Sequence, residues 1–145
     1  MALGDGFPDA ATRIGAERYR QVGGQPFRNL APGVDLPGQV DLEVPYSVAR
    51  VPGVAIVGRR GRVTAILLTT WRAQTRSGVG VGDNLALVRR REKGARCERD
   101  RQLDRPECVV TAGRNVAVFA GDPIAVIALA TLSDREPPRS APGTP

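Results

Sequence analysis

Two cysteines are the residues of this chain that could form a covalent cross-link. Cys97 and Cys108 are the only cysteines, and they lie eleven positions apart around the charged run 98–107. This separation is compatible with one disulfide that closes a loop, which the chain-entropy model values at ~3 kcal/mol. Two independent thiols are the alternative, because a cysteine pair alone does not define the redox compartment. We favour the disulfide, and with it an extracytoplasmic setting, secreted or in the cell envelope, over the cytoplasm.

Catalytic and metal-binding residues are scarce. The chain has no histidine, which removes the usual base of serine and cysteine nucleophiles and a common zinc ligand, and no Cys-x-x-Cys pair is present. Asp41 and Glu43 would share one face of a strand, where a carboxylate pair could act as in glycosidases. Alternating acids on a strand are more often its solvated side. We expect no enzyme, no metal site and no cofactor.

A glycine-rich segment, Gly78-x-Gly80-x-Gly82-Asp83, leads into a predicted helix. Backbone N–H groups at a helix start can bind phosphate. The spacing departs from the dinucleotide fingerprint, however, and the lysine and Ser/Thr of a phosphate loop are missing. Asp83, as an acidic N-cap, would also repel phosphate. The segment therefore predicts a structural helix start and not a nucleotide site.

Arginine clusters give the chain a formal net charge of +6, which favours nucleic acid, an anionic surface or an acidic protein as partner. Arg59 and Arg60 form one cluster, and Arg89, Arg90 and Arg91 form another, and the two could build a phosphate-binding patch if the fold placed them together. Twenty of the 21 basic residues are arginine, a bias that a genome rich in G and C also produces. Acidic residues are mixed into the second cluster's surroundings, so nucleic acid is a partner that we do not favour.

Trp71 follows a predicted strand and is the only tryptophan. With three Phe and two Tyr besides, the chain cannot build a dense aromatic platform for stacking bases. At this place a tryptophan is either an exposed anchor for a protein partner or, more often, a cover for the edge of a core.

Two helices are predicted from apolar spacing and end signals. The first covers residues 10–22, with Asp9 as its cap after Pro8. The second begins after Asp83, carries a basic end at 89–93 and stops at Gly94, in agreement with the helix dipole.

Strands are predicted from β-branched and alternating runs. Residues 39–44 read as one strand inside the Pro- and Gly-rich stretch 25–53, which is otherwise expected to be loop. Residues 54–57 and 63–70 form a hairpin around a charged turn at 58–62. Three more antiparallel strands follow at 108–111, 115–119 and 124–131.

These elements predict an α+β domain, an antiparallel sheet with two helices on one face, over residues 9–132. Residues 1–8 are expected to be a flexible tail, and the Pro-rich residues 133–145 a disordered one. Residues 54–70 parallel residues 116–131, which favours two tandem helix-plus-hairpin units at 9–70 and 78–132. Chance similarity between apolar hairpins is the other explanation.

Targeting signals are not apparent. No stretch approaches the ~20 apolar residues of a membrane span. Residues 1–8 have neither the charged region nor the apolar region of an export signal, which is compatible with the mature or truncated part of a longer product.

Residues 78–131 resemble small modules of bacterial envelope proteins, in which a Gly-Val-Gly-x-Gly-Asp helix start precedes an antiparallel sheet. The plan is similar to that of the beta-lactamase inhibitory proteins, where the unit is duplicated, and of small lipoproteins of outer-membrane assembly. The resemblance covers little over a third of the chain, and residues 25–53 have no counterpart in it. No inhibitory or assembly residue can be carried over.

Three function classes follow. The first is a non-enzymatic secreted or cell-envelope module that presents one sheet face to a protein partner. The second is a basic nucleic-acid-binding domain, whose affinity would fall steeply with salt. The third is a small-molecule-binding domain with a cavity between sheet and helix, which a ligand would stabilise against heat.

Overall fold

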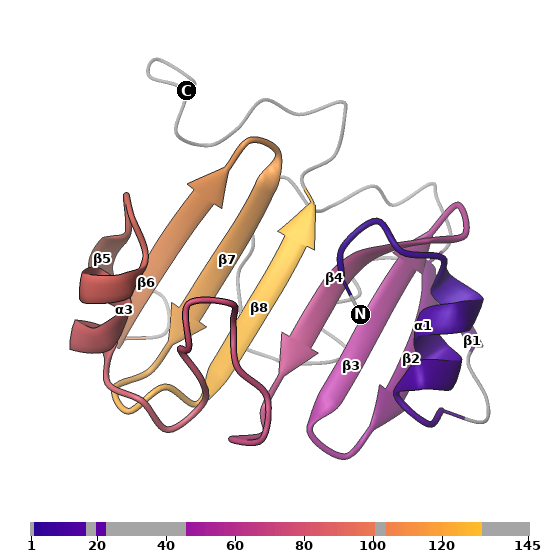
Figure 1. The fold of residues 1–145 in the computed structure, drawn as a ribbon, viewed down its shortest axis with the longest axis horizontal. Coiled ribbons are helices and arrows are strands. Elements are labelled where there is room, and N and C mark those ends of the chain that lie inside the picture. Colours follow the sequence, from indigo (N-terminus) through magenta and orange to yellow (C-terminus); the bar gives the residue numbers. More distant parts are fainter. Residues whose placement is uncertain (1, 17–19, 23–45, 101–103, 132–145) are drawn as a thin grey trace.

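The chain folds around one antiparallel sheet, seen in a computed structural model that describes residues 2–16, 20–22, 46–100 and 104–131 (Figure 1). The sheet has eight strands in the order β1-β2-β3-β4-β8-β7-β6-β5. Two helices accompany it in the described residues, so the α+β class is confirmed. The helices are α1 (Phe7–Arg13) and α3 (Leu85–Arg91), and the strands are β1 (Arg20–Val22), β2 (Tyr46–Val51), β3 (Val54–Arg59), β4 (Arg62–Leu68), β5 (Arg96–Asp100), β6 (Arg105–Ala112), β7 (Asn115–Ala120) and β8 (Val126–Thr131).

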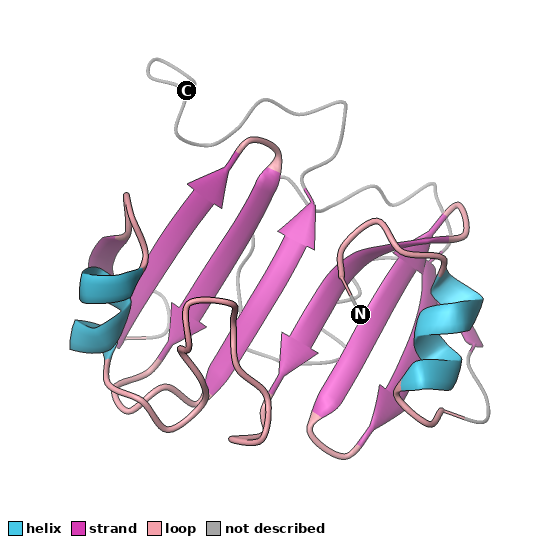
Figure 2. Cartoon of the chain, in the orientation of Figure 1, coloured by secondary structure: helices cyan, strands magenta, loops and turns pink. Residues whose placement is uncertain are grey.

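Both helices pack on the same core cluster. The buried residues of α1 and of α3 belong to one group with inward residues of the sheet, and Figure 2 shows the two helices in front of opposite halves of the sheet. Contacts place α1 against β2, β3 and β4, and α3 against β5 and β6. The two helices therefore cover the outer parts of this sheet face, and the loop that joins β4 to α3 lies over its middle.

The strand order is the same from either edge of the sheet. Among the described residues, one helix and four strands precede the middle, one helix and four strands follow it, and β4 pairs with β8 where they meet. Leu67 lies opposite Ala128 in this central pair, Ala55 lies opposite Leu67, and Val118 lies opposite Ala128. When the two halves are matched through this central pair, Ala55 corresponds to Val118. The parallel between residues 54–70 and 116–131 instead matches Ala55 with the residue before Val118, so the two alignments differ by one residue. Sequence duplication itself stays a prediction.

The first helix lies earlier than its apolar spacing predicted. It begins at Phe7, with Pro8 in the first turn, where the fixed φ of proline suits a helix start. It ends at Arg13, and Gly15 follows with a φ of +83°, a conformation that stops a helix at little cost. The prediction of a helix over 10–22 is therefore wrong at both ends, because Arg20–Val22 is the edge strand β1.

The first residues of the chain are bound to the sheet, contrary to the expected flexible tail at 1–8. Gly4 donates its N–H to the carbonyl of Val63 at 2.8 Å, and the N–H of Val63 donates to the carbonyl of Asp5 at 2.8 Å. The pairing of β4 with β8 covers only Ala65–Leu68, so the start of β4 has backbone groups to spare. The N-terminal segment satisfies them.

The predicted hairpin over residues 54–70 is confirmed, with a tighter turn than expected. Arg60 and Gly61 alone join β3 to β4, at φ values of 53° and 75°, which is the pattern of a two-residue turn that matches strand twist. The strands expected over 108–131 appear as β6, β7 and β8.

Three strands were not predicted. β2 lies within the stretch 25–53 that was expected to be loop, and β1 lies within the predicted helix. β5 overlaps the charged run 98–107, where the disulfide was expected to close a loop. The strand predicted at 39–44 and the tail at 133–145 lie outside the described residues.

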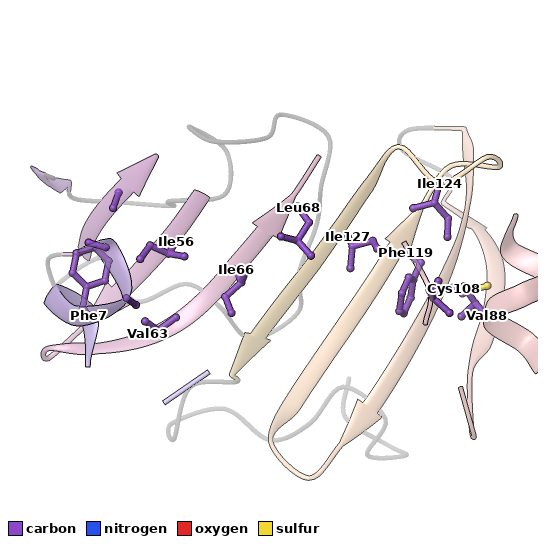
Figure 3. Packing of buried hydrophobic residues seen from close by; sticks show 14 of the residues in the cluster. Phe7, Ile56, Val63, Ile66, Leu68, Val88, Cys108, Phe119, Ile124 and Ile127 are labelled. Carbon is purple, nitrogen blue, oxygen red and sulfur yellow. The ribbon is translucent and has the colours of Figure 1, made fainter. Parts of the chain in front are cut away.

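The core extends across both halves of the sheet (Figure 3). On the helix side, Phe7 and Ile56 lie in the first half, and Phe119 and Val88 lie in the second. The opposite face carries smaller side chains, each at most 9% exposed: Ala55, Val57, Ala65, Leu67, Val116, Val118, Ala128 and Ala130. All of these side chains except that of Leu67 are alanine or valine, at alternate strand positions.

Candidate functional site

The two cysteines are joined, as predicted. Cys97 lies directly opposite Cys108 in the β5–β6 pair, their sulfur atoms are 2.03 Å apart and their Cα atoms 4.0 Å apart. Cys108 is fully buried. The disulfide does not close a solvated loop; it fastens the outermost strand of this half to the core.

The glycine-rich segment is a structural helix start, but Asp83 is not its cap. The carboxylate of Asp83 accepts the N–H of Gly80 at 2.8 Å, and Asn84 holds the N-cap position without a side-chain bond. The N–H of Leu85 is instead bound by Oδ1 of Asp122 at 3.3 Å, across 37 residues. An aspartate thus occupies the place where a phosphate would have to bind.

The two arginine clusters lie far apart. Arg59 and Arg60 flank the β3–β4 turn, whereas Arg89, Arg90 and Arg91 end helix α3, which packs on β5 and β6. β3 and β6 are four strand spacings apart in the sheet, or about 19 Å at the usual ~4.8 Å between strands.

Part of the second cluster is also engaged within the fold. Arg91 Nη1 donates to the carbonyls of Ser77 and Gly78, at 3.3 Å and 3.1 Å. The structure therefore does not assemble the phosphate patch that the sequence allowed.

Trp71 is exposed. Its side chain is 72% accessible, and among the described residues it is the only large hydrophobic side chain that is exposed. The guanidinium of Arg72 lies 5.7 Å from the centre of its ring, within the range of a cation–π contact. The first of the two alternatives for Trp71, an exposed side chain, is thus the observed one.

The backbone that carries Trp71 is held in place. Thr69 donates its N–H to the carbonyl of Gly53 at 2.9 Å. The N–H of Arg72 reaches the hydroxyl of Thr70 at 3.3 Å, and Gln74 bridges to Gly80. The indole is therefore presented by an ordered loop.

A cavity of about 380 Å³ lies between this loop, the N-terminal segment and the sheet. Its lining combines apolar strand residues with polar residues of the loop and of the end of α3: Leu3, Thr75, Arg76, Ser77, Glu92, Val110, Ala112, Asn115, Val116, Ala117, Phe119 and Leu129. Sequence reasoning named none of these as site residues. No motif joins them, because they come from five separate parts of the chain.

The described residues contain neither a cluster of metal ligands nor a membrane-spanning helix. No group of three or more His, Cys, Asp or Glu there could hold a metal ion. In the same part of the chain, no helix has the length and apolar character needed to cross a membrane.

Comparison with known proteins yields no relative. No protein-family model, no curated protein and no solved structure matches the chain. The resemblance to envelope modules stays a prediction.

Proposed function

We propose that the protein is a non-enzymatic, secreted or cell-envelope module that binds a protein partner through the loop around Trp71. The observation that carries the proposal is the 72% exposure of this indole on an ordered loop. A partner that covers this exposed indole removes its apolar surface from water. Tryptophan and arginine residues that become buried on binding contribute most of the binding energy of many interfaces.

The proposed binding surface is the loop around Trp71 and not the sheet face that the first hypothesis named. The first hypothesis required exposed apolar residues on one sheet face, but eight apolar residues of the face opposite the helices are at most 9% exposed, and Val109 and Val126 beside them are partly buried. Trp71 and Arg72 instead supply an apolar plate with a cation beside it. This pair suits a partner surface in which an apolar pocket adjoins a carboxylate.

Two further observations support the proposal. The ordered backbone means that little conformational entropy is lost on docking. The disulfide, in which Cys108 is fully buried and Cys97 half-buried, suits an oxidising compartment outside the cytoplasm.

The test compares capture of partners from the native host by wild-type protein, Trp71→Ala and the matched control Gln74→Ala, which removes an exposed side chain from the same loop. Cross-linked partners are quantified by mass spectrometry, and the leading one is purified for a direct titration. We expect Trp71→Ala to weaken binding about 30-fold or more, as for an interface hot spot, and Gln74→Ala to leave it unchanged. A partner that binds the Trp71→Ala variant as tightly as wild type would overturn the proposal.

The compartment is tested separately by alkylating protein purified from its native host without reductant. Intact mass should show no modified thiol. Two alkylated cysteines would place the protein in a reducing compartment and remove the envelope part of the proposal.

A further inference from the structure

The cavity beneath the β4–α3 loop has the size and composition of a ligand site. Its volume of about 380 Å³ falls within the range of roughly 300–1,000 Å³ for small-molecule pockets. Val110, Ala117 and Leu129 are half-buried members of the helix-side cluster, and they line the cavity together with Phe119. An apolar body of modest size could rest on these strand residues.

Glu92 places a carboxylate at one edge of this apolar surface. The hydroxyl groups of Thr75 and Ser77 lie within hydrogen-bonding reach of its Oε1, at 3.4 Å for Thr75. Among the described residues, Oε2 has no hydrogen-bond partner and Glu92 has no ion pair.

The position of Glu92 at the end of helix α3 also favours a cation beside its carboxylate. It is the C-cap of α3, where the negative end of the helix dipole disfavours an anion. A bound ammonium group would offset both the missing counter-ion and the dipole.

Arg76 places a cation at the same cavity. Its side chain is exposed, and in the described part of the chain it makes no hydrogen bond or ion pair. Although both residues line one cavity, Arg76 and Glu92 do not pair with each other. One pocket thus holds two opposite charges that do not pair with each other.

We infer that the cavity binds a small zwitterion with an apolar body, of the chemical class of the apolar α-amino acids. The ammonium group of the ligand binds Glu92, with the Thr75 and Ser77 hydroxyls fixing the carboxylate. The ligand carboxylate binds the guanidinium of Arg76, which can hold it through two parallel hydrogen bonds. The apolar side chain covers Val110, Ala117 and Leu129. This site is independent of the partner surface at Trp71.

The first experiment titrates the full chain with L-phenylalanine by calorimetry and follows its melting temperature. We expect saturable binding and a rise in melting temperature with ligand concentration. Three analogues test the three contacts: 2-phenylethylamine lacks the carboxylate, 3-phenylpropanoate lacks the ammonium, and glycine lacks the apolar body. Each should bind about tenfold or more weakly, since each leaves one feature of the site unpaired.

Variants assign the charges. Glu92→Gln keeps the size and the hydroxyl contacts, and should lose affinity for L-phenylalanine but not for 3-phenylpropanoate. Arg76→Gln should show the reverse selectivity, losing affinity for L-phenylalanine but not for 2-phenylethylamine. Arg72→Gln, on the same loop but outside the cavity, is the control and should bind as wild type. Circular dichroism melts in the absence of ligand show whether each variant is folded.

Three outcomes would overturn the inference. They are no binding of L-phenylalanine up to about 10 mM, a range that detects affinities weaker than millimolar, binding of the three analogues as tight as that of L-phenylalanine, or an equal loss of affinity in the Arg72→Gln control. Because Trp71 lies outside the lining of this cavity, partner binding can survive each of these outcomes, so the two proposals fail separately.

Discussion

The ring of Phe7 lies directly on the backbone of Gly58. A Cβ atom built on Gly58 would come within 2.3 Å of Cδ2 and 2.6 Å of Cγ of Phe7, and both residues are buried. Helix α1 can approach strand β3 this closely only because position 58 has no side chain. The docking of helix α1 on strand β3 therefore requires a glycine at position 58.

Gly58→Ala is therefore expected to destabilise the fold by about 2 kcal/mol, within the usual cost of overpacking a core. Urea denaturation followed by circular dichroism measures the change. Gly6→Ala is the control, because a Cβ there meets only Asp9 Oδ2 at 3.7 Å. Equal stability of the Gly58→Ala variant and wild type would mean that α1 does not pack on β3 as described.

The disulfide should contribute substantially to stability. Replacing Cys97 and Cys108 by alanine is expected to lower the free energy of unfolding by ~3 kcal/mol, because β5 is an edge strand held on one side only. Adding reductant to wild type should lower its melting temperature and leave that of the double variant unchanged. A reductant effect of equal size on both proteins would argue against the bond.

Asp122 is expected to stabilise helix α3 from outside the helix. Asp122→Ala removes the acceptor of the Leu85 N–H and should cost ~1 kcal/mol, as the loss of a helix cap does. Asp104→Asn is the matched control: it removes the charge that pairs with Arg99 at 3.1 Å between largely exposed side chains, and it tolerates the positive φ of 49° at this position. Such pairs contribute roughly 0.2–1 kcal/mol. The comparison is made by chemical denaturation at one pH, and a larger loss in the control would contradict the capping role.

Trp71 and Phe119 should separate binding from stability. Phe119 is fully buried, so Phe119→Ala is expected to cost about 3–5 kcal/mol through the cavity that it leaves. Trp71→Ala removes an exposed side chain and should change stability by less than ~0.5 kcal/mol. If Trp71→Ala destabilised the protein as much as Phe119→Ala, the indole would be a core residue in solution and the proposed docking role would fail.

The local elements could be predicted because their signals are contiguous in the chain. The β-branched runs on either side of Arg60-Gly61 specify a hairpin, since both turn residues adopt positive φ there. The basic end and following Gly94 place the end of α3 close to its observed position. The cysteine spacing allowed the disulfide, which needs only that two neighbouring strands align.

The remaining features depend on which strands become neighbours, and that is decided by packing across the whole sheet. β1 and β2 have weak local signals and form a pair, Arg20 opposite Val48, that joins segments far apart in the chain. The same sheet order separates Arg60 from Arg91 by several strands, whereas it places Glu92 and Leu129, a residue of strand β8, around one cavity. Side-chain chemistry is thus readable from the residues, but the sites depend on distances between strands that no local pattern contains.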